Sequence, residues 1–135
     1  MIAGMMGAQM RSVAAGPAAA RYWRVYITAV RSGNYAGLAE VKMRAPGGAV
    51  ISVGGTPAAS SAFSGLFTAS QAFDGFADAG HNGWMTSNTA PPHWIAYDFG
   101  SAKSVGSLEI IAYSATMNSH LNDLKDFQLQ SSDDN

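Results

Sequence analysis

The feature that most constrains the fold is a period-two pattern of hydrophobic residues in short segments. In residues 22–29, Trp23, Val25 and Ile27 lie on one side of an extended chain, and Tyr, Arg and Thr side chains lie on the other. The segment 94–99 alternates in the same way. Both segments are rich in β-branched and aromatic residues, which favours strands over helices. The pattern therefore predicts a β protein.

Turn signals separate such segments along the whole chain. Clusters of Gly, Pro, Asn and Ser, such as 32–34 and 46–48, recur about every ten residues. Strands are expected at 22–29, 41–44, 49–53, 94–99, 105–113 and 124–131. In the second of these, Val41 and Met43 should face inward. No segment has a helical period, so we predict an antiparallel β-sandwich.

Composition limits the class of protein further. A chain of 135 residues is long enough for one domain with its own core. Only 13% of the residues are charged and the net charge is −1, which gives no electrostatic reason to expect binding to nucleic acid or to an acidic membrane. The chain has no cysteine, which excludes disulfides and favours a bacterial or viral source. No apolar run approaches the roughly 20 residues that span a bilayer.

The two ends of the chain differ from the middle. Residues 1–20 are mostly Met, Ala and Gly with one charged residue, Arg11, and Gly16-Pro17 disfavours a helix before the first strand. We expect an extended arm or linker over 1–20 and the sandwich over 21–135; a cleaved signal peptide is the alternative. Residues 132–135 resemble a hairpin turn. The strand that pairs with 127–131 is therefore expected to be missing or to come from elsewhere.

Several motifs occur in a defined order. They are Thr56–Ser61, Ala72-Phe73-Asp74-Gly75, Trp84, Trp94–Gly100 and Asp126–Asp134. Together they resemble the discoidin family, also called the coagulation-factor type C domain. In that family, segments like Arg21–Val25 and Leu38–Val41 close the domain, whereas here they come first. The order is therefore circularly permuted and is similar to that of discoidin-type domains in bacteriophage virion proteins.

The resemblance implies a galactose-binding-like jelly-roll β-sandwich that binds rather than catalyses. It also implies a structural calcium ion, with Asp74 and Glu40 as carboxylate ligands and backbone help from Ala39 and from the segment Phe76 to Asp78. Oxygen ligands in a loop suit calcium. The chain has Phe76-Ala77-Asp78 where the family usually has a short Asn-x-x-Thr segment. The alternative is that Asp74 only caps a turn.

The resemblance further places ligand contacts in the loops at one end of the sandwich. The loop 61–70 carries Phe63, Leu66 and Phe67, whose side chains would contact a sugar, a lipid or a neighbouring subunit. We expect at least one of the three to fold back over the core.

Polar loop residues are candidates for binding sugar hydroxyls. They are His81, Asn82, Asn118 and His120, with Tyr35 or Trp84 as an aromatic platform. The alternative is that they are ordinary solvated loop residues. Trp84 and Trp94 are themselves better explained as core residues at strand starts.

Catalysis has little support in the sequence. The three histidines, His81, His93 and His120, lack the close spacing of a zinc site. No nucleophile elbow, phosphate loop or dinucleotide fingerprint is present. We expect a non-enzymatic virion component, such as a head decoration protein, head fibre or tail adhesin. It would form homo-oligomers, contact other virion proteins and bind a cell-surface glycan. The alternatives are a purely structural virion protein and a carbohydrate-binding module of a secreted bacterial protein.

Overall fold

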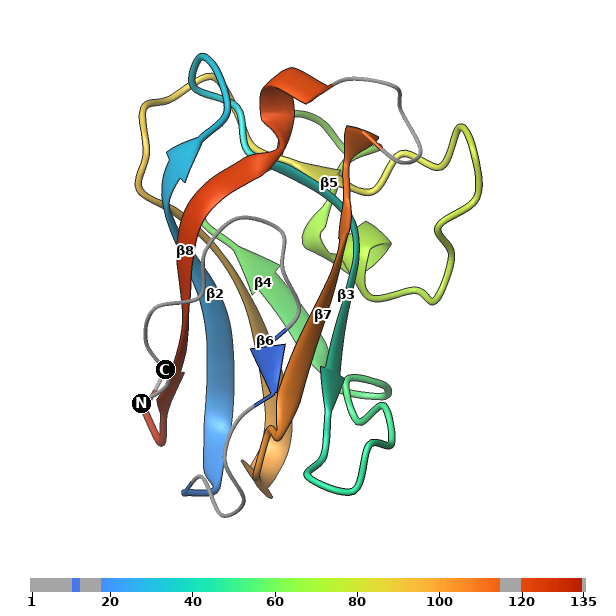
Figure 1. Ribbon diagram of the computed structural model, residues 1–135, viewed down its shortest axis with the longest axis vertical. Coiled ribbons are helices and arrows are strands. Elements are labelled where there is room, and N and C mark those ends of the chain that lie inside the picture. The colour runs from blue at the N-terminus through green and yellow to red at the C-terminus, as the bar shows by residue number, and fades with distance from the viewer. Residues whose placement is uncertain (1–10, 13–17, 115–119, 135) are drawn as a thin grey trace.

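The computed structural model describes residues 11–12, 18–114 and 120–134, which form an all-β sandwich of two antiparallel sheets (Figure 1). One sheet has the strand order β1-β7-β3-β5, and the other has the order β4-β6-β2-β8. The strands are β1 (Arg11–Ser12), β2 (Ala20–Val30), β3 (Gly37–Arg44), β4 (Thr56–Ala59), β5 (Trp84–Met85), β6 (His93–Lys103), β7 (Ser107–Ala112) and β8 (Leu124–Ser132). Two short 3-10 helices, η1 (Ala69–Ala72) and η2 (His120–Asn122), lie in the connections. The predicted antiparallel sandwich is confirmed.

The period-two pattern of the sequence corresponds to the two faces of the second sheet. In β2, Trp23, Val25 and Ile27 are buried, and the residues between them are partly exposed. In β6, Ile95 and Tyr97 are buried in the same way. β2 pairs with β6 on one side and with β8 on the other, so its inward side chains lie at the centre of the core.

The core lies between the two sheets. The first sheet contributes buried side chains from β3 and β7, including Val41 and Met43, which confirms their predicted direction. The largest side chains that are almost completely buried are Trp84, Tyr97, Ile27, Leu38, Met43, Ile95, Leu108 and Leu129. Burial of an aliphatic or aromatic side chain of this size stabilises a fold by about 1.5–3 kcal/mol.

Two local predictions are wrong. Residues 49–53 do not form a strand. An isolated bridge joins Val50 to Arg44, and the Met43 N–H donates to the side-chain hydroxyl of Ser52 and not to a backbone carbonyl. The tryptophan at position 94 is not a core residue. Since Ile95 faces the core, Trp94 must face outward, and it is half-buried on the outer face of β6.

β8 forms one edge of its sheet. It pairs antiparallel with β2 from Tyr22 opposite Ser132 to Val30 opposite Leu124. Within the described ranges, no strand lies on its other side. The strand that pairs with 127–131 is therefore β2, which comes from elsewhere in the chain and not from a segment that follows the turn at 132–135.

Most of the expected arm, residues 1–20, lies outside the described residues. Its described part includes β1, which pairs with β7 at Leu108 and Ser107, and Ala20, which begins β2. In the part of the chain that the structure describes, no helix has the length and hydropathy needed to cross a membrane.

Candidate functional site

The candidate metal site is built around Glu40 on the outer face of β3. Val41 and Met43 point into the core, so Glu40 and Lys42 point to the opposite side of the strand. A strand irregularity lies between Leu38 and Glu40, directly before this point. Although its side chain leaves the core, Glu40 is only 1% exposed. The segment between η1 and β5, residues 73–83, covers this part of β3, because the Gly75 N–H bonds to Glu40 and Gly83 lies against Leu38.

Glycine allows the covering segment to approach β3 closely. Gly83 has a positive φ of 63°, and a Cβ at this position would overlap the carbonyl oxygen of Leu38. The next residue, Trp84, pairs with Leu38 at the start of β5. The end of the covering segment is thus fixed against the strand that carries Glu40.

Asp74 shapes the other end of the covering segment. Its Oδ1 accepts a hydrogen bond from the Phe76 N–H at 3.0 Å, and its Oδ2 lies 3.2 Å from His81 Nε2. Gly75, with a φ of 83°, occupies the turn between these groups. Asp74 therefore does cap a turn, and it also contributes a second carboxylate beside Glu40.

The environment of Glu40 disfavours its charge. Burial, and to a smaller extent the charge of Asp74, raise the pKa of Glu40 to about 7, although hydrogen bonds from the Gly75 and Val41 N–H groups and attraction to Lys42 act in the opposite direction. The Oε1 atom of Glu40 is buried and has no hydrogen-bond partner among the described residues. A buried carboxylate oxygen without a partner is costly, and a bound cation would satisfy it.

The donors at this position fit a hard cation. Glu40 and Asp74 offer carboxylate oxygens, and backbone carbonyls of a loop can add further oxygen ligands, as calcium requires. Among the residues that the structure describes, no three His, Asp or Glu side chains form a metal-binding group. A calcium ion here would therefore depend on backbone oxygens. The Asp78 carbonyl already accepts the His81 N–H at 2.9 Å, and the Asp78 side chain is exposed.

The predicted apolar loop lies against β5. The Phe63 N–H donates to Met85, and the Met85 N–H donates to Phe67. The rings of Tyr35, Phe63 and Phe67 form a chain of edge-to-face contacts, with centroids 5.9 and 5.6 Å apart. Phe63 and Leu66 are 50% and 65% exposed, whereas Phe67 is half-buried. The loop thus presents an aromatic and apolar surface.

Of the four polar candidates, the structure describes the side chains of His81 and Asn82. His81 is turned toward its own loop, with Nε2 3.1 Å from the Gln71 carbonyl oxygen, and Asn82 is half-buried beside it in the chain. Asn118 lies outside the described residues. The backbone of His120 begins η2, and its side chain lies outside the described part.

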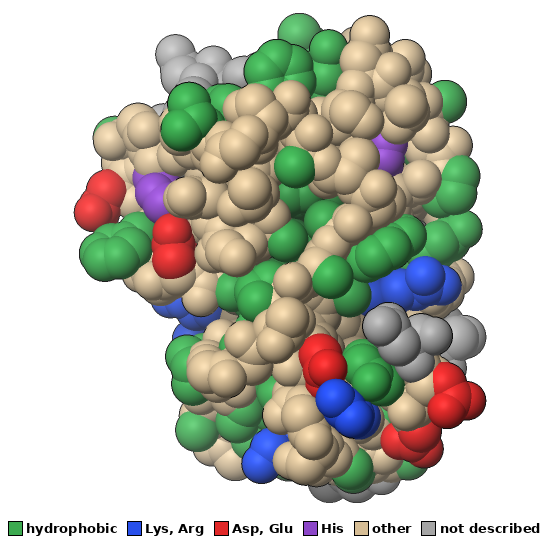
Figure 2. All heavy atoms as spheres, turned by 180° about the vertical axis from the view of Figure 1, so that it is seen from behind, with side chains coloured by type: hydrophobic (Ala, Val, Ile, Leu, Met, Phe, Trp, Pro, Cys, Tyr) green, Lys and Arg blue, Asp and Glu red, His purple; other side chains and the backbone are tan. Residues whose placement is uncertain are grey.

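The two proposed aromatic platforms differ in exposure. Trp84 is completely buried, and its indole N–H donates to the Ser61 carbonyl at 2.9 Å, so it cannot stack on a ligand. Tyr35 is partly exposed and contacts Phe63. Figure 2 shows a histidine between acidic side chains at one margin of the molecule, with a hydrophobic side chain beside them. His81 contacts both Asp74 and the ring of Phe76, which is 60% exposed.

A second candidate site was missed by the sequence reasoning. A hollow of about 530 Å³ lies on the outer face of the β4-β6-β2-β8 sheet, and Trp94, Tyr22, Arg24 and Asp98 are among its lining residues. The alternation in β2 and β6 identifies these side chains as outward-facing. It does not reveal that they surround a hollow, because that depends on the pairing of strands distant in sequence.

Comparison with known proteins gives no further assignment: no protein-family model matches the chain, and no curated protein matches it.

Proposed function

We propose that this protein is a non-enzymatic component of a bacteriophage particle that binds a cell-surface carbohydrate. In this proposal the sandwich is a galactose-binding-like jelly roll, and the loops beside β5 contact the glycan. The single observation that carries the proposal is the exposed aromatic surface at this end, where Phe63 is 50% exposed and contacts Tyr35. Aromatic rings beside polar loop groups are typical of sites that bind sugars.

Binding at such a surface would be shallow and reversible. A sugar ring would pack on Phe63 or Tyr35, and neighbouring polar groups such as Asn82 would bind its hydroxyls. Each contact is individually weak. Many copies on one particle would raise the overall strength, because each later binding event is intramolecular.

A calcium ion held by Glu40 and Asp74 is part of the proposal. The unpartnered Oε1 of Glu40 supports it, as does the second carboxylate beside it. When bound, the ion would offset the repulsion between the two carboxylates and fix the segment that covers β3. This segment ends at β5, which the apolar loop contacts through Phe63 and Phe67.

The test is a glycan array probed with the labelled protein and two variants. Phe63→Ala should lose most of the signal for at least one glycan that the wild-type protein binds. Val53→Ala is the matched control, because Val53 is also an exposed hydrophobic residue, at 68%, but lies in the connection after β3 rather than beside β5. Binding that is equal in both variants would contradict a role for the loop.

A structural role in virion assembly is the second candidate. The large hydrophobic side chains that are exposed are Val53, Phe63, Leu66, Phe76 and Leu121. Such residues are often buried between subunits. Light scattering with and without a calcium chelator tests this alternative. A stable multimer with no glycan binding would favour assembly, and a monomer that binds glycans would favour adhesion, on a virion or in a secreted bacterial protein.

A further inference from the structure

The hollow on the outer face of the β4-β6-β2-β8 sheet has the construction of a binding site. Strand pairing places Ala58, Ala96, Arg24 and Gln130 side by side across the four strands. The two alanines leave space above the sheet, and larger side chains rise on either side of them. The volume of about 530 Å³ is within the range of about 300–1,000 Å³ that is typical of small-molecule sites.

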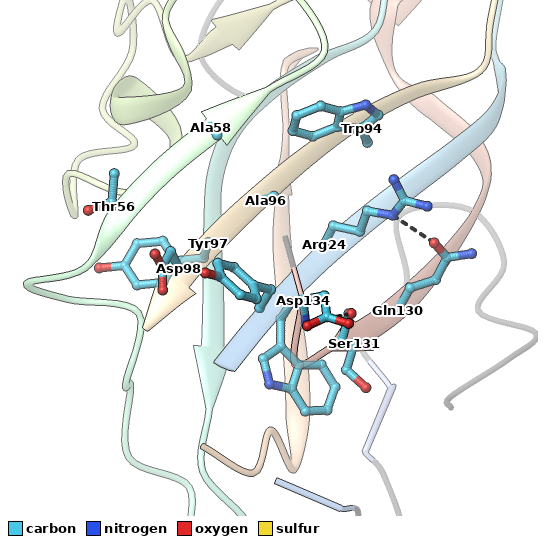
Figure 3. A pocket seen from close by; sticks show the side chains of 13 residues that line it. Arg24, Thr56, Ala58, Trp94, Ala96, Tyr97, Asp98, Gln130, Ser131 and Asp134 are labelled. Atoms are coloured by element: carbon cyan, nitrogen blue, oxygen red, sulfur yellow. Dashed lines mark hydrogen bonds between the residues drawn. The ribbon is translucent and has the colours of Figure 1, made fainter. Parts of the chain in front are cut away.

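An aromatic ring forms one wall of the hollow. Trp94 is two residues before Ala96 on β6, so both side chains are on the outer face. Figure 3 shows Ala96 between Trp94 and Asp98 along β6, with Arg24 and Gln130 on the next two strands. Trp94 is half-buried, so part of its ring is open to a ligand. The apolar face of a sugar ring packs well on such a surface.

Arg24 supplies a positive charge that the described residues do not neutralise. Its Nε donates to Gln130 Oε1 at 2.7 Å (Figure 3), and its guanidinium lies 4.7 Å from the centre of the Tyr26 ring. Gln130 is oriented in turn by its own donation to Gln128 Oε1 at 3.2 Å. Among the described residues, no carboxylate forms an ion pair with Arg24. The two Nη groups therefore remain available as a fork for an anion.

Two carboxylates also line the hollow, and one of them is balanced by an arginine. Asp98 accepts two hydrogen bonds from Arg21, at 2.8 and 3.0 Å, and these bonds hold the pKa of Asp98 below its usual value. Asp134 also lines the hollow, in the exposed segment after β8. Among the described residues, Arg24 is thus the cation that lines the hollow and has no ion pair, and Asp134 lies in the same lining.

We propose that this hollow binds an acidic sugar of a polysaccharide. The sugar ring packs on Trp94, its carboxylate accepts from the Nη groups of Arg24, and its hydroxyls bind Gln130 and nearby polar groups. Guanidinium and carboxylate match in geometry and charge, which selects a carboxylated sugar over a neutral one. The inference takes the carbohydrate class of ligand from the proposed function, but it does not depend on the loop residues beside β5.

The test is calorimetric titration with two matched pairs of probes. They are trigalacturonate with its methyl ester, and 3′-sialyllactose with lactose. At least one acidic probe should bind at least 10-fold more tightly than its neutral partner. Arg24→Gln should remove this preference, and Trp94→Ala should weaken binding of the acidic probe by at least 10-fold. Asp134→Asn should tighten it at low salt, because a repelling charge is removed.

Further variants separate this site from the loop. Ala96→Phe fills the hollow without removing a contact group and should also abolish binding, while Phe63→Ala should leave it unchanged. Circular dichroism confirms that each variant is folded. The inference is overturned if no acidic probe binds, if acidic and neutral probes bind equally, or if Trp94→Ala and Ala96→Phe bind like the wild type. Loss of array signal in Phe63→Ala alone would keep the proposed function and reject this site.

Discussion

Glu40 should make the protein less stable as the pH rises through neutrality. Its pKa is about 7 in the folded protein, against 4.5 for the unperturbed group. The folded state therefore holds the proton more tightly than the unfolded state. The contribution of this group to stability is fully present below pH 4.5 and is lost as the pH rises through about 7. The difference corresponds to about 3 kcal/mol of unfolding free energy, at about 1.36 kcal/mol per pH unit.

The assay is urea unfolding at a series of pH values between 4.5 and 8, with a chelator present so that no divalent ion binds. The unfolding free energy of the wild-type protein should fall by about 3 kcal/mol more over this range than that of Glu40→Gln, because the glutamine side chain does not titrate. Glu109→Gln is the matched control. Glu109 lies on the neighbouring strand β7, is about one-third exposed and pairs with Arg44 at 2.9 Å.

Charged neighbours of Glu40 need to be separated from it in this experiment. Asp74 and Lys42 interact electrostatically with Glu40, and His81 contacts Asp74. His81→Asn, alone and combined with Glu40→Gln, isolates the histidine. Equal pH dependence in the wild-type protein and Glu40→Gln would refute the reasoning, because it would mean that Glu40 is ionised in the fold without cost.

Two further predictions concern the same region. Calcium at 100 times its dissociation constant should stabilise the wild-type protein by about 2.7 kcal/mol at pH 7.5. The midpoint of thermal unfolding should then rise for the wild-type protein but not for Glu40→Gln. An equal rise in both proteins would reject Glu40 as a ligand. Gly83→Ala should destabilise the protein by about 2 kcal/mol or more, since a Cβ there meets the Leu38 carbonyl, whereas Gly80→Ala, also at positive φ but with open space around it, should cost about 1 kcal/mol. Urea unfolding measures both glycine variants, and equal losses would show that backbone conformation alone matters at position 83.

The parts of the fold that follow a regular period could be predicted from the sequence. Trp23, Val25 and Ile27 alternate with polar residues, and they do line the core. The alternation of buried and exposed residues does not hold in residues 37–41 of β3, because all five are buried. The irregularity beside Ala39 and the segment that covers Glu40 are tertiary features. No local pattern in the sequence indicates them, and only the family resemblance connects Glu40 with Asp74.

The site on the sheet illustrates a second limit of sequence reasoning. Ala58, Ala96 and Arg24 are far apart in the chain, and only the register of three strands makes them neighbours. Its position at the start of a strand predicts a core location for Trp94. In β6, Ile95 faces the core, so the side chain of the preceding residue, Trp94, lies on the opposite face of the strand.

The central place of β2 has a consequence for how the chain folds. β2 is the first long strand of the described chain, yet its partners β6 and β8 are among the later strands. During synthesis, Trp23, Val25 and Ile27 must therefore wait for residues near 95 and 129 before they can be covered. Pairings of such long sequence separation close slowly, on the millisecond-to-second scale typical of β-sandwiches. Until β6 emerges, β2 is an apolar strand with both edges open, and one edge stays open until β8 emerges. Capture of the nascent chain by a chaperone is therefore an expected step in its biogenesis.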